Sequence, residues 1–336
     1  VASDASLTGL TTVDLAADAA STGGTTASQA TATSNAGTLE GAGLGASTIG
    51  GVGTIGGQVT STGAASAANV TGGATGFSDL DDSTGLDTSN TTTVKSDGTL
   101  QGFSVNSLSA DAATTNGIAD SDALGGTIQG ADLSTVSIGG VGAVTGSANF
   151  SADASSANVE NGESNGLADV NTVDGLISST TTIKSDGTLN GLASIDLGAT
   201  AESTSGSMAY AEADAGNLQG AELNGLTDIG GVGSVAGSTD LSSSAAASNV
   251  TGGAVATGKL TRAEGLDLDA TLNIASDASI SGIAGINSSA DAATTAGMAD
   301  ADATSTTITG ADLAGGIVDV GGIGSIAGQA NFGLSA

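Results

Sequence analysis

The chain has 336 residues and a net charge of −31, with four Lys and Arg against 35 Asp and Glu, and it contains no His, Cys, Pro or Trp. This charge argues against nucleic acids and anionic membranes as partners, because phosphate groups are bound by clustered Lys and Arg. Without His or Cys the chain can form neither a Ser–His or Cys–His catalytic pair nor the usual zinc sites, and without Pro it is not collagen-like.

The distribution of apolar residues indicates strands. Apolar and small polar residues alternate in runs such as 7–13 and 136–138, which is the period of a strand and not of a helix. A backbone that pairs almost everywhere would also exclude Pro, since Pro cannot donate to a β ladder. The Ala-rich stretches 64–68 and 245–247 could form short helices, but the interleaved Ser residues favour strands.

Two motifs repeat along the chain with the same period. A Gly-Gly-apolar-Gly motif occurs at residues 50–53, 139–142, 230–233 and 321–324. A Ser-Asp pair occurs at residues 3–4, 96–97, 185–186 and 276–277. The spacing is about 90 residues for both motifs, as expected for a repeat architecture. We therefore predict one continuous domain over 1–336, divided into the superrepeats 1–93, 94–182, 183–273 and an incomplete 274–336.

A shorter unit is visible inside each superrepeat. An apolar-x-Gly pattern recurs at residues 100–102, 128–130 and 144–146, and in a looser form at 159–162, so that the glycines are multiples of roughly 15 residues apart. The sequence thus predicts an all-β fold, a parallel β-solenoid with short rungs of about 15 residues and about six rungs per superrepeat. Stacked at ~4.8 Å, some 22 rungs would give a narrow rod about 100 Å long. Neither end carries an atypical capping segment, so we expect the coil to continue into another copy.

Calcium is the cofactor that the composition leaves open, because carboxylates two residues apart lie on one face of a strand and oxygen ligands suit Ca²⁺. The candidate ligands are Asp79, Asp81, Asp82, Asp120, Asp122, Asp267, Asp269, Asp300 and Asp302. The calcium nonapeptide of β-rolls is missing, however, since Thr54 follows the first Gly-Gly-Val-Gly where that motif has Asp. We therefore predict that this motif forms a steric corner. Paired carboxylates are also the only catalytic chemistry available, and no sugar-binding aromatic residues accompany them, so we expect no enzyme activity.

The Gly-Gly-apolar-Gly motifs and the Ser-Asp repeats give the whole chain a resemblance to the repeat regions of bacterial extracellular matrix and adhesin-type surface proteins. That resemblance is one of style and implies a secreted or cell-surface location and a mechanical role. We expect a fibre-forming structural protein whose main partner is itself, in a head-to-tail polymer or a longer repeat chain, with no nucleic acid and no membrane insertion. The alternative is a ligand-binding solenoid that recognises Ca²⁺, ice or glycans. Divalent cations would bind to its carboxylates.

Overall fold

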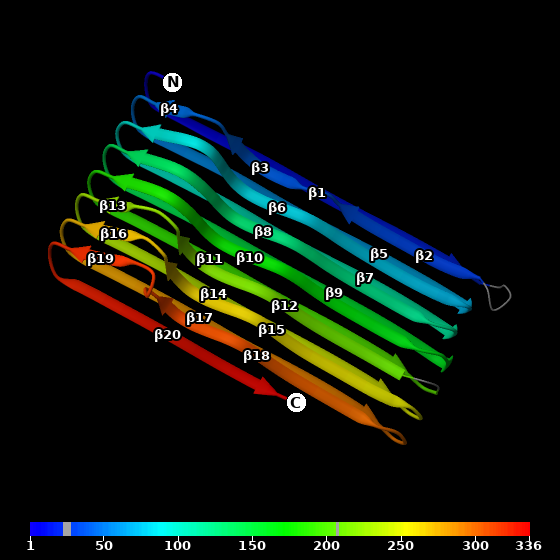
Figure 1. Ribbon diagram of the computed structural model, residues 1–336. Helices are drawn as coiled ribbons and strands as arrows, with labels where there is room; N and C mark the ends of the chain where they lie inside the picture. The colour runs from blue at the N-terminus through cyan, green and yellow to red at the C-terminus, as the bar shows by residue number, and fades with distance from the viewer. Residues whose placement is uncertain (23–27, 206–207) are drawn as a thin grey trace.

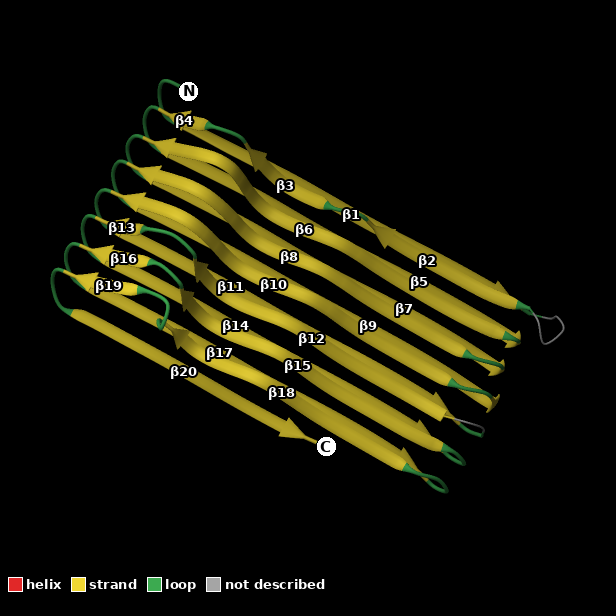
Figure 2. Ribbon diagram, viewed as in Figure 1, coloured by secondary structure: helices red, strands yellow, loops and turns green. Residues whose placement is uncertain are grey.

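The computed structural model describes residues 1–22, 28–205 and 208–336, and every regular element in that part of the chain is a strand. The strands form two sheets that lie face to face (Figures 1 and 2). Sheet A contains β1 (Ala5–Ser21), β5 (Gly53–Thr71), β7 (Gly98–Asn116), β9 (Gly142–Asn161), β11 (Gly187–Ser203), β14 (Gly233–Asn249), β17 (Ala278–Thr294) and β20 (Gly324–Ser335). Sheet B contains β2 (Gln29–Ala36), β3 (Leu39–Leu44), β4 (Ser47–Ile49), β6 (Gly73–Val94), β8 (Ala119–Ile138), β10 (Ser164–Ile183), β12 (Met208–Leu223), β13 (Thr227–Ile229), β15 (Gly253–Leu268), β16 (Thr271–Ile274), β18 (Ala299–Asp312) and β19 (Ile317–Val320).

The chain winds through these sheets as a coil. Each turn runs along sheet A, crosses to sheet B, returns along sheet B and crosses back, and every strand pairs in parallel with its equivalents in the neighbouring turns. This arrangement confirms the predicted parallel β-solenoid. The register gives the length of a turn: Gly53 pairs with Gly98, and Gly98 with Gly142.

The length and shape of the turn correct the expected rung. Equivalent residues of neighbouring turns are 44 to 48 residues apart, so the unit of about 15 residues is one third of a turn and a superrepeat contains two turns. The eight strands of sheet A span about 34 Å along the axis, whereas a strand of 20 residues is about 66 Å long. The described coil is therefore a flattened slab and not a narrow rod of 100 Å.

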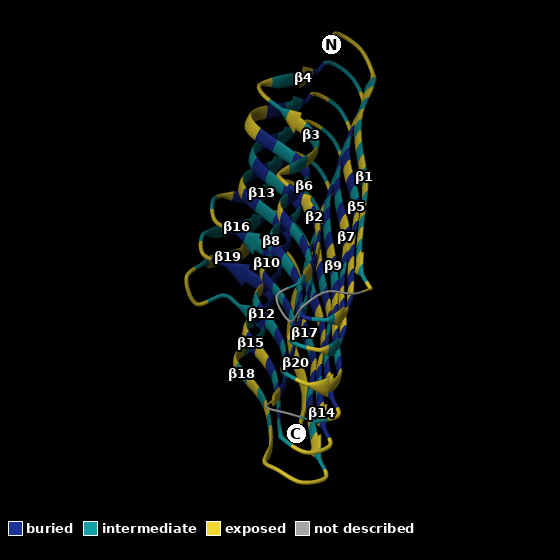
Figure 3. Cartoon of the chain, turned by 90° about the vertical axis from the view of Figure 1, so that its right-hand side faces the viewer, coloured by how far each residue is buried: buried dark blue, intermediate teal, exposed yellow. Residues whose placement is uncertain are grey.

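The core lies between the two sheets, where alternate side chains of the inner strands are buried (Figure 3). It has two large compartments and one smaller cluster of six buried Ala residues. The first, which we call the Leu/Ile compartment, holds residues such as Ile55, Leu100 and Ile183, and only three of its 23 buried members are Ala. In the second, the Ala compartment, 20 of the 32 buried members are Ala. The Ala-rich stretches 64–68 and 245–247 lie in β5 and β14, so they are strands and not helices.

Two columns of glycine separate the compartments. In sheet A the column includes Gly102, Gly146 and Gly191, and in sheet B it includes Gly130 and Gly175. A Cβ atom on Gly130 would lie 2.2 Å from the Ser147 backbone nitrogen and 2.5 Å from the Gly175 carbonyl oxygen. The two backbones thus approach as closely as only glycine allows. The apolar-x-Gly pattern at residues 100–102, 128–130 and 144–146 marks this contact and not the start of a rung, whereas the looser match at 159–162 lies at the end of β9.

The segments that lead from sheet B back to sheet A explain the two-turn superrepeat. We call them the Gly/Asp corner, because Ser-Asp and Gly-Gly-apolar-Gly segments alternate there from turn to turn. The backbone amide of each Gly-Gly-apolar-Gly segment donates a 2.8 Å hydrogen bond to the aspartate of the preceding turn. The pairs are Val52 with Asp4, Val141 with Asp97, Val232 with Asp186, and Ile323 with Asp277.

The second glycine of the motif makes room for this hydrogen bond. A Cβ atom on Gly140 would lie 2.1 Å from Asp97 Oδ1, and the same holds within a few tenths of an ångström at Gly51, Gly231 and Gly322. The predicted role of the motif as a steric corner is therefore confirmed. A complete repeat needs one turn to supply the carboxylate and the next to supply the free amide, which is why the sequence repeats every two turns.

The opposite segments, from sheet A to sheet B, also alternate, and we call them the Asn corner. In register, Asn69 is followed by Thr114, Asn158, Ser203 and Asn249 in successive turns. The side-chain amides of Asn69 and Asn249 donate to the carbonyls of Gly73 and Gly253 at 2.9 and 3.1 Å, and the Thr114 hydroxyl donates to Gly72 at 2.9 Å. Both corners are thus held by side chains that bond to the backbone.

Candidate functional site

The outer face of sheet B is the strongest candidate for a functional surface, because it carries most of the carboxylates that the sequence singled out. Asp79 lies there on β6, Asp122 and Asp132 on β8, and Asp169 on β10, and all four are half-buried. The outer face of sheet A has mainly Ser, Thr, Ala and Gly at the matching positions, with fewer acidic residues. We refer to the outer side of sheet B as the acidic face.

The cluster Asp79, Asp81 and Asp82 lies on β6. Together with Asp169 of β10 these residues line a shallow groove on the acidic face. Burial raises the pKa of Asp79, and the nearby charge of Asp81 raises it further. Asp82 is engaged within the fold, since its Oδ1 accepts a 3.1 Å hydrogen bond from the Thr127 amide of the next turn.

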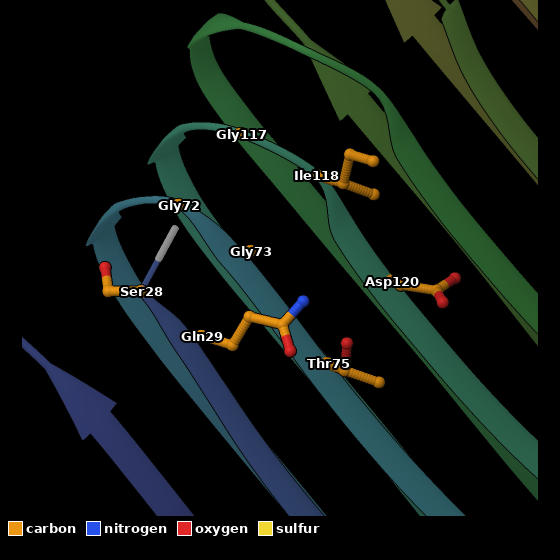
Figure 4. A pocket seen from close by; sticks show the side chains of 8 residues that line it. All are labelled: Ser28, Gln29, Gly72, Gly73, Thr75, Gly117, Ile118 and Asp120. Atoms are coloured by element: carbon orange, nitrogen blue, oxygen red, sulfur yellow. The ribbon is translucent and has the colours of Figure 1, made fainter. Parts of the chain in front are cut away.

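The pair Asp120 and Asp122 lies near the start of β8, close to the Asn corner. Figure 4 shows Asp120 at the edge of a groove that it shares with Gln29 and Thr75 of the two preceding turns. Burial, followed by the charge of Asp120, raises the pKa of Asp122 to about 6. Burial also raises the pKa of Asp120, although a hydrogen bond with the Asn165 side chain lowers it.

The remaining pairs lie far from these groups. Asp300 and Asp302 on β18 share columns with Asp120 and Asp122, but four turns separate them. Asp267 Oδ2 lies 3.4 Å from Arg262 Nη2. Asp269 lies in the loop between β15 and β16. Burial raises the pKa of Asp267 to about 6, followed by the charges of Glu264 and Asp269.

The structure therefore does not gather the calcium candidates into one site. Within residues 1–22, 28–205 and 208–336, no group of three or more His, Cys, Asp or Glu side chains is arranged to hold a metal ion. Neighbouring turns place Asn165, Tyr210 and Val255 between Asp120 and Asp300. They place Leu167, Glu212 and Thr257 between Asp122 and Asp302. Calcium binding remains a prediction from the sequence.

A second group of carboxylates, of which the sequence singled out only Asp267, lies where the strands of sheet B bend (Figure 1). It contains Asp132 of β8, Asp174 of β10, Glu222 of β12, and Glu264 and Asp267 of β15. Only the register of 45 residues brings these positions together, so sequence spacing alone could not find them. The one available signal is that Asp174 replaces the Gln of the apolar-Gln-Gly pattern that Gln129 and Gln219 follow.

Two of the four basic residues form ion pairs with the acidic face. Lys259 Nζ lies 2.6 Å from Asp214 Oδ2, and Arg262 Nη2 lies 2.5 Å from Glu264 Oε2. The Lys259–Asp214 pair joins β15 to β12, and the Arg262–Glu264 pair lies within β15. Among the described residues, the carboxylates of β8 and β10 form no ion pair with a basic side chain.

Comparison with known proteins adds no relative. No protein-family model matches the chain, and neither the curated proteins nor the solved structures that were searched contain a match. Among the described residues there is also no helix of the length and apolarity needed to cross a membrane.

Proposed function

We propose that this chain is a structural segment of an extracellular fibre, such as a matrix filament, stalk or adhesin shaft, and not an enzyme. The observation that supports this role is the constant cross-section of the coil, in which each turn pairs in parallel with the next. β20 has the same corner and the same register as the inner strands, yet its residues from Gly324 to Ser335 are exposed. An exposed edge with the cross-section of the coil is a template for a further strand.

The partner that fits such an edge is more of the same coil. β20 pairs with β17 and β1 pairs with β5 in the same parallel register as the inner strands of sheet A. The Gly/Asp corner is compatible with such a junction. β20 follows a Gly-Gly-Ile-Gly segment and β1 follows a Ser-Asp segment, so pairing β1 of a second copy with β20 would continue the alternation of the two segments. Lengthening can come from further turns of one chain or from a second copy.

The coil geometry sets a condition for a second copy. The position that follows β20 along the coil lies in sheet B, beyond β18 and β19. A second copy that pairs its β1 with β20 would leave this position empty, because its own sheet B begins one turn later with β2. Addition of one half-turn should therefore promote end-to-end association.

The repeat supplies a suitable half-turn. Ala336 occupies the place of Ala245 two turns earlier, and Val1 matches Ile274 in the repeat. A chain with residues 246–273 appended after Ala336 should present a complete turn. Negative-stain electron microscopy and sedimentation velocity of this chain, the unextended chain and a chain with the same 28 residues scrambled would test the proposal.

We expect filaments of constant width that are longest for the extended chain. Single coils at all protein concentrations for all three chains would contradict the proposed assembly. Monodisperse coils whose melting temperature rises with Ca²⁺ would instead favour the ligand-binding alternative.

A further inference from the structure

The Asp174 side chain is the most unusual group on the acidic face. It is 4% exposed, and its Oδ1 atom is buried with no hydrogen-bond partner among the described residues. Asp174 lies between Val173 and Gly175, which belong to the core side of β10, so its carboxyl points to the outer side of the bend. A buried carboxylate oxygen without a donor is costly, because ionised groups lose their hydration on burial.

The surroundings of Asp174 add negative charge and almost no donors. In its own column, Gln129 of β8 and Gln219 of β12 flank it, and Gln129 is the side chain that hydrogen-bonds to it. In the adjacent column, Asp132 and Glu222 lie on either side of Ile177.

Further along the sheet, the charged groups are Asp87 on β6 and Arg262, Glu264 and Asp267 on β15. On the sheet A side, Gly175 meets the β11 backbone at Leu192, and the acidic residues of β11, Asp196 and Glu202, lie beyond it toward the Asn corner.

The same fold position two turns later shows how the coil treats a carboxylate there. Glu264 occupies the column of Asp174 in β15, is also buried, and is neutralised by Arg262 at 2.5 Å. The residue that matches Arg262 in β10 is Thr172. Asp174 therefore has the burial of Glu264 without its counter-charge, and the remaining way to remove its charge is to bind a proton.

We propose that Asp174 binds a proton in the folded coil, so that the central turns formed by β8, β10 and β12 are most stable in mildly acidic solution and loosen when the carboxyl ionises. A protonated carboxyl can donate a hydrogen bond, so it fits a column in which both neighbours are amides. Burial, followed by the Glu222 charge, raises the pKa of Asp174 to about 7.

The direction of the effect follows from this shift. The carboxyl of the folded chain holds its proton at a higher pH than the unfolded chain, whose pKa is 3.8. The folded state thus binds more protons between pH 3.8 and about 7, and the free energy of unfolding falls as the pH rises through that window.

The test is the pH dependence of unfolding in two variants and one control. Asp174→Asn keeps the shape and removes the titration, and Thr172→Arg supplies the guanidinium that β15 has. Asp240→Asn removes an exposed carboxylate of β14 as the matched control. Thermal melts between pH 4.5 and 8.5 should show a melting temperature that falls from pH 4.5 to about 7 and then levels off in the wild type and in the control, with a clearly smaller fall in both Asp174→Asn and Thr172→Arg.

A direct measurement keeps the proposal falsifiable if a variant does not fold. In the ¹³C spectrum of the labelled wild-type chain, the Asp174 carboxyl should titrate near neutral pH. A midpoint below about 4.5, or variants with the same pH dependence as the wild type, would overturn the proposal. It would also be overturned if Ca²⁺ at pH 8 raised the melting temperature as much as acid does and Asp174→Asn removed that effect, because the group would then bind a cation.

Discussion

The two compartments of the core solve the same packing problem in opposite ways. Next to the Gly/Asp corner, Leu, Ile and Val fill the Leu/Ile compartment, whereas toward the Asn corner columns of Ala fill a longer and thinner space. The glycine columns between them set the local separation of the sheets at backbone contact. The difference shows that separation between sheets, and not hydrophobicity alone, decides which residues a solenoid turn can bury.

The glycine columns should be the most sensitive place in the coil. Gly130→Ala would put a methyl group 2.2 Å from the Ser147 nitrogen, so the sheets must move apart and both compartments lose contacts. We expect a loss of about 3 kcal/mol or more in the free energy of unfolding, measured by urea denaturation. Gly56→Ala is the matched control, since the nearest atom to its added Cβ is 3.9 Å away, and it should be close to neutral. Equal losses at the two positions would show that the close approach does not hold the compartments apart.

Shortening a large side chain in the Leu/Ile compartment should have the next largest effect. Leu176 is fully buried in the Leu/Ile compartment, and Leu176→Ala leaves a cavity that the flanking turns can only partly close. We expect a loss of about 3 kcal/mol in urea unfolding. The same change at the exposed Leu10 should cost a few tenths of a kcal/mol at most, as is usual for surface positions.

Larger side chains should be tolerated less well in the Ala compartment than in the Leu/Ile compartment. Ala213 is fully buried in the Ala compartment, where a larger side chain must push against the facing column of sheet A. We expect Ala213→Leu to lower the free energy of unfolding by about 2 kcal/mol. The comparison variant is Ala221→Leu in the Leu/Ile compartment, also fully buried, and it should cost less. The reverse order in thermal melts would mean that the Ala compartment is not the tighter of the two.

The corners should give the smallest effects. Asp97→Ala removes the acceptor of the Val141 amide at the Gly/Asp corner, and we expect a loss of about 1 kcal/mol, as for other lost caps. Hydrogen exchange should increase at the Val141 amide and not at the Asn corner. Thr114→Val at the Asn corner, which removes the hydrogen bond to Gly72, should show the opposite pattern.

Much of this fold could be predicted from the sequence, because period-2 alternation, the absence of Pro and the motif repeats all follow from parallel pairing. The length of a turn could not. The glycines at 102, 130 and 146 lie alternately in sheet A and sheet B, so their spacing measures the distance between sheet contacts and not the turn. Alternation at the corners hid the real turn as well, since Asp97 and the Gly-Gly-Val-Gly of residues 139–142 are equivalent in space but differ in sequence.

The carboxylates show the same limit. D-x-D spacing correctly places two side chains on one face of a strand, but it contains no information about which residues lie beside them in the next turn. Asp120 has Thr75 and Asn165 as neighbours, whereas Asp174 is near Asp132 and Glu222. Lateral neighbours depend on a register of about 45 residues, which the structure alone reveals.

The hydrogen bond between each corner aspartate and the amide of the following turn has a consequence for how such a protein can change its length. Deletion of residues 98–141 would join two Ser-Asp turns and lose an aspartate–amide pair, whereas deletion of residues 98–186 would join Asp97 to Gly187 and restore the original sequence order. Genetic duplication or loss would therefore preserve every corner only in steps of two turns. The unit by which such a coil can gain or lose length during evolution is therefore a pair of turns.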